Sequence, residues 1–253
     1  MGERMKRLDG KTAIVTGAGQ GFGEGIAETF AREGAKVAVL DLNGDLARQV
    51  AARLGAQAIA IAADVSKAAD VERATAETLT AFGRIDILVN NAGISHRNQP
   101  MLDVGDTEFD KVFAVNVKSI YLFAKSVVPA MRQQGGGIIL NIGSTAGIRP
   151  RPGLTWYNAS KGAVNLMSKA MAVELAPDRI RVNAIAPVAG ETPLLATFMG
   201  EDTPEKRAAF RATIPWGRLS TAQDIANAAL FLCSDEAEMV TGEVLQVDGG
   251  RCI

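Results

Sequence analysis

The sequence predicts an α/β protein built on one doubly wound, seven-stranded parallel sheet with helices on both faces. Two patterns predict this fold class. Short runs rich in Val, Ile and Leu recur along the chain, and they are apolar almost throughout, as parallel strands covered on both faces are. Longer alanine-rich segments with helical spacing of apolar residues separate these runs, and this alternation favours right-handed crossover connections.

Each expected element follows from one of these two patterns. The expected strands are, in chain order, Thr12–Thr16, Lys36–Leu40, Ala58–Ala62, Ile85–Val89, Gly137–Ile142, Ile180–Ile185 and Val244–Val247. The expected helices are Gly23–Glu33, Asp45–Leu54, Ala69–Phe82, Thr107–Arg132, Trp156–Leu175 and Ala222–Ser234. No linker, repeat or low-complexity tract divides the sequence, so residues 1–253 are expected to form a single domain.

Charge and composition argue against several classes of function. The chain has 27 Lys and Arg against 28 Asp and Glu, so it has no overall attraction to nucleic acid or to an anionic membrane. The charged stretch Met1–Arg7 leads into no apolar segment, and no uncharged apolar run is long enough to span a bilayer. Two cysteines are too few for a disulfide framework. We therefore expect a cytoplasmic protein with neither nucleic-acid nor membrane partners.

A glycine-rich loop follows the first strand and opens the first helix. Gly17 permits a tight turn, Gly21 lets the backbone approach a pyrophosphate, and Gly23 allows close packing of helix on strand. The N–H groups at the start of the helix would face the anion. A structural turn can have the same glycines, but the strand before the loop and the helix after it favour a dinucleotide site.

Asp41 ends the second strand, 20 residues beyond Gly21. A carboxylate there can accept hydrogen bonds from both hydroxyls of a ribose, and it would repel a 2′-phosphate. No Arg or Lys lies at 17–23 or 42–44 to neutralise such a phosphate. The sequence therefore predicts NAD(H) in preference to NADP(H), the alternative for Asp41 being a helix-capping or turn acid.

Polar or small residues also follow the third and fourth strands. Asp64 and Val65 could meet the adenine, although an Asp before a helix is often an N-cap. Asn91, Ala92 and Gly93 would let the backbone pass close to a ligand. The carboxyl ends of parallel strands are where such sheets bind ligands, so we expect both groups in one crevice.

Tyr157 and Lys161 lie four residues apart at the start of a predicted helix, so they share one face of it. A neighbouring ammonium group favours a phenolate, and Lys161 is therefore expected to bring the pKa of Tyr157 toward the range of a general acid–base. Ser144 follows the fifth strand and could hydrogen-bond a carbonyl or alcohol oxygen, while Asn116, inside a helix, could hold a water molecule. Each of the four also has an ordinary structural explanation when taken alone.

The combined motifs resemble the short-chain dehydrogenase/reductase family, with its Rossmann fold, over nearly the whole chain. They are TGAGQGFG at 16–23, NNAG at 90–93, Asn116, Ser144, YNASK at 157–161 and NAIAP at 183–187. The resemblance implies a catalytic tetrad in which Tyr157 is the acid–base, Ser144 polarises the carbonyl, Lys161 activates Tyr157 and holds the nicotinamide ribose, and Asn116 orders a relay water. It also implies reversible hydride transfer between a secondary alcohol and its ketone, and a homotetramer packed through the helices at 107–132 and 156–175.

The sequence departs from the family pattern in a few places. The usual Pro-Gly after the sixth strand is Pro187-Val188 with a glycine at Gly190, and Thr192 still falls where the family contacts the nicotinamide. Phe22 replaces a common isoleucine, and Gly143 replaces the common serine before Ser144. The expected coenzyme contacts are Gly17, Gln20, Gly21, Phe22, Gly23, Asp41, Leu42, Asp64, Val65, Asn91, Ala92, Gly93, Tyr157, Lys161, Pro187, Gly190 and Thr192.

Other residues bear on the substrate. Apolar residues with prolines at about 188–216 predict a mobile lid, unless they only cover the core. Arg149 and Arg151 could bind a carboxylate or a phosphate, although arginines in loops are more commonly solvated. His96, the only histidine, is expected at the rim of the cleft, and with no second histidine we expect no metal site.

The leading hypothesis is an NAD(H)-dependent alcohol/ketone oxidoreductase with a small-molecule substrate. An NADPH-dependent 3-oxoacyl-(acyl-carrier-protein) reductase is the alternative within the family, although such enzymes usually have Arg in place of Gln20 and no acid at position 41. A methyltransferase or a silent nucleotide sensor would share the glycine loop, but neither accounts for Tyr157 and Lys161 together with Ser144.

Overall fold

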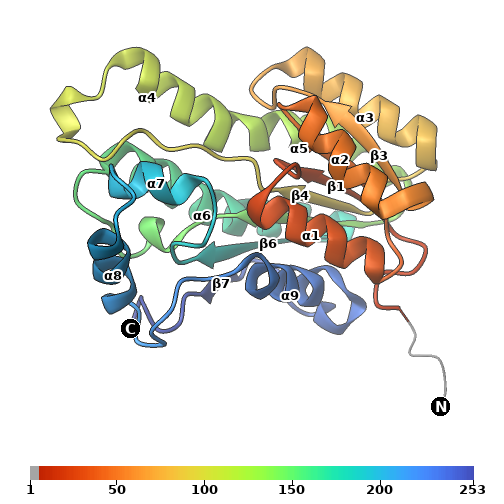
Figure 1. Ribbon diagram of the computed structural model, residues 1–253. Coiled ribbons are helices and arrows are strands. Elements are labelled where there is room, and N and C mark those ends of the chain that lie inside the picture. The colour runs from red at the N-terminus through yellow and green to blue at the C-terminus, as the bar shows by residue number, and fades with distance from the viewer. Residues whose placement is uncertain (1–5) are drawn as a thin grey trace.

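Seven parallel strands form one sheet in the order β3-β2-β1-β4-β5-β6-β7. The structure is a computed structural model and describes residues 6–253, so most of the charged stretch Met1–Arg7 lies outside the described residues (Figure 1). The strands are β1 (Thr12–Thr16), β2 (Lys36–Asp41), β3 (Ala58–Ala62), β4 (Ile87–Asn90), β5 (Gly137–Ile142), β6 (Ile180–Pro187) and β7 (Val244–Val247). The predicted fold class is confirmed.

Helices cover both faces of this sheet. They are α1 (Gly21–Arg32), α2 (Gly44–Leu54), α3 (Ala68–Phe82), α4 (Asp106–Phe113), α5 (Ser119–Gln133), α6 (Thr155–Leu175), α7 (Leu194–Met199), α8 (Pro204–Ala212) and α9 (Ala222–Cys233). Side chains of α1, α2 and α9 share one hydrophobic core with the sheet, and those of α3, α5 and α6 share a second core on the other face.

Alternate residues of each strand enter different cores, which explains the continuous hydrophobicity of the strands. In β1, Ala13 and Val15 face the first core while Ile14 faces the second, and all three are fully buried. Since successive side chains of a strand point to opposite faces, a strand buried on both sides must be apolar at every position.

The helix expected over Thr107–Arg132 is interrupted. The chain forms α4, then a π-helical turn at Ala114–Lys118, and then α5. Smaller differences are that α1 begins at Gly21 rather than Gly23, that β2 includes Asp41, and that β4 begins at Ile87 rather than Ile85. A π-helical turn depends on one local rearrangement of backbone hydrogen bonds, so apolar periodicity cannot reveal it.

By length and hydropathy alone, the helical stretch Asp106–Gln133 could cross a membrane, and 44% of its most apolar window is buried in the protein. Phe123, Val127 and Met131 of this stretch are fully buried in the core between the sheet, α3 and α6. One face of α5 is therefore packed on the sheet.

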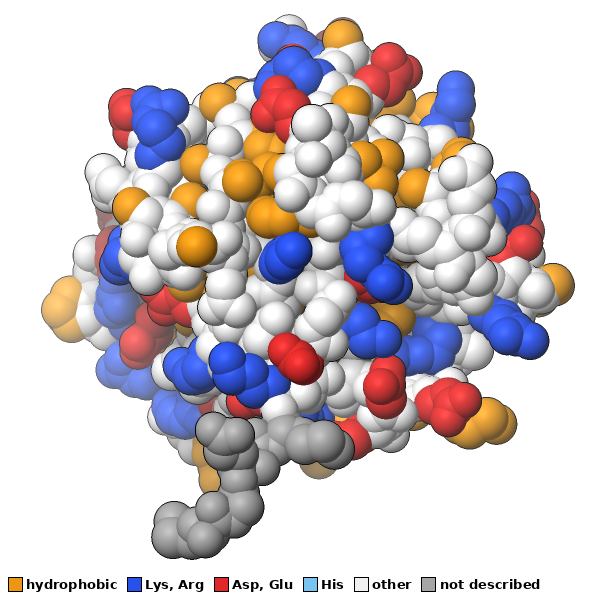
Figure 2. Space-filling view, turned by 90° about the vertical axis from the view of Figure 1, so that its right-hand side faces the viewer, with side chains coloured by type: hydrophobic (Ala, Val, Ile, Leu, Met, Phe, Trp, Pro, Cys, Tyr) orange, Lys and Arg blue, Asp and Glu red, His pale blue; other side chains and the backbone are white. Residues whose placement is uncertain are grey.

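Charges of both signs are interspersed on the face shown in Figure 2, with Lys and Arg lying among Asp and Glu. Several charged side chains of the protein form ion pairs, such as Arg132 with Asp178 at 2.8 Å. This mixture agrees with the balanced composition of the sequence.

Two glycines allow a matched test of the fold. A Cβ on Gly23 would lie 2.2 Å from the Gly17 carbonyl oxygen, whereas a Cβ on Gly162, within α6, would meet nothing closer than 3.8 Å. We expect Gly23→Ala to lower the free energy of unfolding by at least about 2 kcal/mol through overpacking. We expect Gly162→Ala to raise it by roughly 0.5 to 1 kcal/mol because alanine favours the helix. Urea unfolding of both variants checks this, and a Gly23→Ala protein as stable as wild type would contradict the packing described.

Candidate active site

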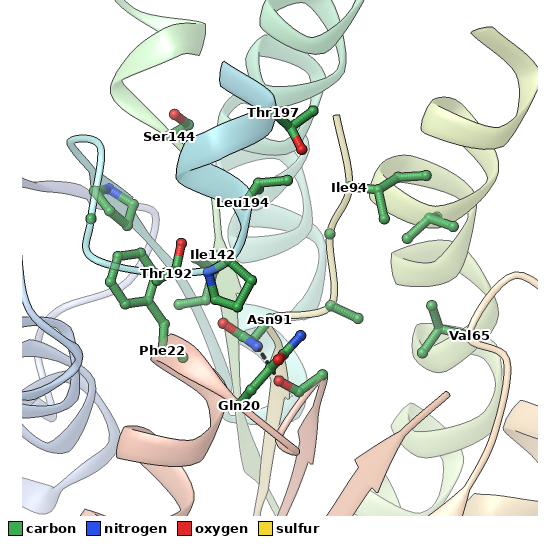
Figure 3. A pocket seen from close by; sticks show the side chains of 18 of the residues that line it. Gln20, Phe22, Val65, Asn91, Ile94, Ile142, Ser144, Thr192, Leu194 and Thr197 are labelled. Carbon is green, nitrogen blue, oxygen red and sulfur yellow. Dashed lines mark hydrogen bonds between the residues drawn. The ribbon is translucent and has the colours of Figure 1, made fainter. Parts of the chain in front are cut away.

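A cavity of about 650 Å³ opens at the carboxyl ends of the strands. Figure 3 shows Gln20 and Phe22 on one side of it, Val65 on another, and Thr192, Leu194 and Thr197 extending over it. Most of the predicted residues line this cavity: Gly17, Gln20, Gly21, Phe22, Asp41, Leu42, Asp64, Val65, Asn91, Ala92, Gly93, Ser144, Tyr157, Lys161, Pro187, Gly190 and Thr192. Gly23 and Asn116 lie behind the lining.

The glycine loop has the geometry that its sequence predicts. Gly17 and Gly21 have φ of 60° and 61°, a backbone conformation that favours glycine. A Cβ on Gly17 would lie 2.9 Å from the Cα of Ala92, so the loop passes directly against the segment after β4. Gly23 allows the start of α1 to pack on the loop itself, as described above.

Thr16 and Asn91 hold this loop in place. The Thr16 hydroxyl accepts hydrogen bonds from the backbone N–H groups of Asn91 and Ala92, both at 3.0 Å. The Asn91 amide donates to the carbonyl oxygens of Thr16 and Gly17 at 2.8 and 3.0 Å. Sequence reasoning expected Asn91 at the ligand but missed Thr16, because a threonine at the end of a buried strand carries no distinctive signal.

Asp41 lines the cavity and also supports the surrounding turns. Its carboxylate accepts hydrogen bonds from the N–H groups of Gly19 and Asn43, both at 2.9 Å. Asn43, and not Asp41, caps α2, so the helix-capping alternative for Asp41 is wrong. Its turn-forming role and its place in the cavity coexist.

Asp64 accepts hydrogen bonds from the N–H and hydroxyl of Ser66 at 3.0 and 2.6 Å. The Ser66 hydroxyl is the main cause that holds the pKa of Asp64 below its ordinary value. The N-cap position of α3 is Lys67, so Asp64 does not cap that helix and stays at the cavity.

These residues fit a dinucleotide. At Gly17 and Gly21 the loop offers backbone free of side chains to a pyrophosphate, and Asp41 and Asp64 line the cavity beyond it. A Cβ on Gly93 would lie 3.3 Å from the Lys161 Nζ and 3.5 Å from the Asn116 Oδ1, so only a small residue leaves that space open. Such a coenzyme would supply the hydride; the protein groups would bind, orient and transfer the proton.

Tyr157 and Lys161 extend from the first turns of α6 toward the end of β5, and both are about 5% exposed. Burial raises the pKa of Tyr157 to about 12, and the neighbouring Ser144 hydroxyl acts in the opposite direction. Burial lowers the pKa of Lys161 to about 8. The Lys161 Nζ donates a hydrogen bond of 2.7 Å to the Ile142 carbonyl oxygen.

The predicted lowering of the Tyr157 pKa by Lys161 is therefore not seen in this structure. Loss of hydration opposes charge on both groups and dominates here. At neutral pH Tyr157 is a neutral phenol, which is the form that can donate a proton to a ketone oxygen.

Asn116 lies in the π-helical turn and is almost fully buried. Its Oδ1 accepts from the Ile94 N–H at 2.9 Å, and its Nδ2 donates to the Ile94 carbonyl at 2.9 Å and to the Ser160 hydroxyl at 3.0 Å. The side chain thus joins the segment after β4 to α6. Its relay water stays a prediction.

The segment expected to form a lid contains α7 and α8, and it packs through a small hydrophobic cluster of its own. The buried members are Val188, Leu195, Met199, Ile214 and Leu219. Phe198 of α7 lies against Tyr157 with ring centroids 5.0 Å apart, and Asn98 donates hydrogen bonds to the carbonyl oxygens of Phe198 and Pro152 at 3.2 and 3.3 Å. This segment therefore lines the cavity and also packs as a small core, and its mobility as a lid stays a prediction.

Three residues considered for contact with the substrate do not line the cavity. His96 is fully buried rather than at the rim, with its Nδ1 2.9 Å from the Arg97 carbonyl oxygen. Arg149 donates to the Arg251 carbonyl at 2.6 Å, and Arg151 donates to the Thr213 hydroxyl and lies over the Phe210 ring. The two arginines tie the loop before α6 to the C-terminal segment and to α8. Over residues 6–253, no group of three or more His, Cys, Asp or Glu side chains is placed to hold a metal ion.

Sequence reasoning also missed several lining residues. Among them are Ile94, Lys111 and Val115, whereas Thr197 and Phe198 belong to the segment predicted to form a lid. The positions of the three missed residues depend on the π-helical turn and its surroundings, which no local motif encodes.

Comparisons with known proteins agree with this geometry. Residues 17–251 match the family model described as enoyl-(acyl carrier protein) reductase. A 4-formylbenzenesulfonate dehydrogenase of Comamonas testosteroni is 46% identical over 250 residues, which are 97% of this chain and 99% of the relative.

Two solved structures are also similar. A 3-ketoacyl-(acyl-carrier-protein) reductase from Brucella melitensis, complexed with NADH, is 51% identical with a TM-score of 0.93, over 97% of this chain and 100% of that one. A 7α-hydroxysteroid dehydrogenase complexed with NADH and 7-oxo glycochenodeoxycholic acid is 40% identical with a TM-score of 0.92, over 99% and 97% of the two chains. The chain therefore belongs to the short-chain dehydrogenase/reductase family of oxidoreductases, which use nicotinamide coenzymes.

Proposed function

We propose that this protein transfers a hydride reversibly between NAD(H) and a secondary alcohol or its ketone, with Tyr157 as the acid–base. The observation that carries the proposal is that Ser144, Tyr157 and Lys161 line the same cavity as the glycine loop and Asp41. Proton donor, hydroxyl and ammonium therefore lie together beside the place for a dinucleotide.

In the reducing direction the neutral phenol of Tyr157 donates its proton to the ketone oxygen, and the Ser144 hydroxyl holds that oxygen by a hydrogen bond. The Lys161 ammonium then stabilises the phenolate left behind, because its charge lies in a poorly solvated site. In the oxidising direction the proton moves the opposite way, from the alcohol to the Tyr157 phenolate. The positive charge of oxidised nicotinamide would favour that phenolate.

The coenzyme preference rests on Asp41. Its carboxylate faces the cavity, and Leu42 beside it carries no charge that could hold a 2′-phosphate. Lys111 and Lys161 are the cationic side chains among the described lining residues, and neither adjoins Asp41 in sequence. NADH in both solved relatives named above supports the same choice for this chain.

We further propose a cyclic or aromatic substrate. Leu194, Phe198 and Ile94 give the cavity an apolar wall beside Tyr157, and the Phe198 ring forms a flat surface there. Arg149 and Arg151 are engaged elsewhere, so neither supplies a partner for an acidic tail. A 3-oxoacyl-(acyl-carrier-protein) reductase is the second candidate because the 3-ketoacyl-(acyl-carrier-protein) reductase named above is 51% identical, and Asp41 argues only against an NADPH-dependent form of it.

Assembly and compartment are proposals as well. Tyr121, Leu166 and Val173 expose more than half of their surface on α5 and α6, the helices through which the family resemblance implies a homotetramer. Both cysteines, Cys233 and Cys252, are free thiols, which is usual for a cytoplasmic protein.

The first prediction tests the acid–base. Tyr157→Phe keeps the ring packed against Phe198 but removes the proton, so we expect kcat to fall by a factor of about 100 or more with any alcohol or ketone that wild type turns over. NADH should still bind, as measured by the change in nicotinamide fluorescence. The substrate panel should contain cyclic and aromatic alcohols, hydroxysteroids, sugars and 3-oxoacyl thioesters. Full turnover by the variant would refute the assignment of Tyr157.

A second prediction concerns Asp41. In Asp41→Ala the repulsion of a 2′-phosphate is removed, and we expect the ratio of the NADPH to the NADH affinity to rise about tenfold or more. Fluorescence titration of both coenzymes measures this without a substrate. Asp45→Ala, which removes an exposed carboxylate from α2, is the matched control and should leave the ratio unchanged. An unchanged ratio in Asp41→Ala would show that another group selects the coenzyme.

A third prediction follows from the buried ammonium. The folded protein holds the pKa of Lys161 at about 8, below its ordinary value of 10.5, so between these values the unfolded chain binds more protons. Stability must then rise with pH across that window, by about 2–3 kcal/mol between pH 7 and 10. Lys161→Met should lack this rise in the free energy of unfolding. All other titrating groups are the same in the two proteins, so their contributions cancel in the comparison. Urea unfolding at the two pH values tests it, and equal increments in both proteins would be inconsistent with a desolvated ammonium.

A further inference from the structure

The buried face of α6 continues beyond the Tyr157–Lys161 pair. Asn165 lies four residues after Lys161 and eight after Tyr157, so the three side chains follow one another along a single face of the helix. All three are at least nine-tenths buried. Each is directed at the segment with which β5 ends.

Two of these side chains hold carbonyl groups on either side of Gly143. The Lys161 Nζ donates to the Ile142 carbonyl at 2.7 Å, and the Asn165 Nδ2 donates to the Ser144 carbonyl at 3.3 Å. The Asn165 amide has two possible orientations, which exchange its oxygen and its nitrogen. Only the orientation described places a donor against the Ser144 carbonyl oxygen. The helix thus fixes the residue before Gly143 and the residue after it.

The Asn165 side chain occupies the space that a side chain at position 143 would need. A Cβ on Gly143 would lie 2.1 Å from the Asn165 Oδ1, a distance at which the amide would have to move. That oxygen is itself buried without a hydrogen-bond partner among the described residues. A buried orphan acceptor costs free energy, so the arrangement calls for a compensating role. Gly143 is also where the family commonly has a serine, and here a side chain at 143 and the amide at 165 exclude each other.

We propose that Asn165 is a positioning residue for Ser144 and that it can act only because residue 143 is glycine. This inference rests on the proposed function. The Ser144 carbonyl also accepts from the Gly147 N–H at 3.1 Å, and its hydroxyl accepts from the Ala146 N–H at 3.0 Å. Those bonds lie within the turn itself. Asn165 supplies the bond that joins the turn to the helix carrying Tyr157, and it thereby sets the position of the Ser144 hydroxyl relative to the phenol.

The kinetic test uses Asn165→Leu, which keeps the approximate size of the side chain and removes the donor. We expect kcat for the best substrate of the panel to fall about five- to tenfold, with the NADH affinity within about twofold of wild type. In a Ser144→Ala background the same substitution should have almost no further effect, because the residue acts through Ser144. Ser168→Ala, equally buried on the same helix, is the control for lost stability and should change kcat less than about twofold.

A fall in kcat of equal size in the Ser144→Ala background would overturn the proposal, and so would an unchanged kcat in Asn165→Leu. A wild type that binds NADH but reduces or oxidises no member of the panel would instead refute the proposed function, and the positioning role would fall with it.

The contact itself is tested without substrate. Gly143→Ser should lower the melting temperature markedly in wild type, and clearly less in Asn165→Ala, where the opposing oxygen is gone. Equal losses in the two backgrounds would overturn the proposed exclusion between positions 143 and 165.

Discussion

The hydrogen bond from the buried Lys161 ammonium to the Ile142 carbonyl is the interaction on which the rest of the site depends. An ammonium group deprived of water is costly, and it is tolerated here because it has a partner at 2.7 Å at the very end of β5. The bond ties α6 to the sheet at the level where the strands end. Tyr157, one turn earlier, is held at the same level, and so is the turn that carries Ser144.

Neutral polar side chains also join the segments at this end of the sheet. Thr16 and Asn91 join the ends of β1 and β4, and Asn116 joins the segment after β4 to α6 through Ile94 and Ser160. The last N–H and carbonyl groups of parallel strands lie at one end of the sheet and need hydrogen-bond partners. These side chains supply partners for many of them. What is left is a cavity with ordered walls and few competing charges.

Sequence patterns predicted the strands, the glycine loop and the grouping of Ser144, Tyr157 and Lys161, because each depends on short-range periodicity or on a motif of fixed spacing. They failed where position depends on distant packing. The π-helical turn around Asn116 interrupts a segment whose composition is helical throughout. His96 follows a ligand-binding segment in sequence but turns inward and is buried. Arg149 and Arg151 lie between Ser144 and Tyr157 in sequence, and yet their partners, Arg251 and Thr213, come from the far end of the chain. The Gly143–Asn165 contact is likewise hidden, since neither residue is distinctive alone.

The two buried titratable groups explain how a nearly neutral protein can handle charge at this site. Burial moves the pKa of Tyr157 up to about 12 and that of Lys161 down to about 8, so both shifts favour the uncharged forms. Any new charge in the cavity therefore acts on two groups that solvent screens weakly. In the proposed reaction a developing phenolate at Tyr157 would be stabilised by the Lys161 ammonium, one helical turn away, and the ammonium would in turn become easier to keep protonated. The attraction between Lys161 and Tyr157 is stronger after the phenol has lost its proton than before. A site with this property stabilises the transition state more than the resting protein.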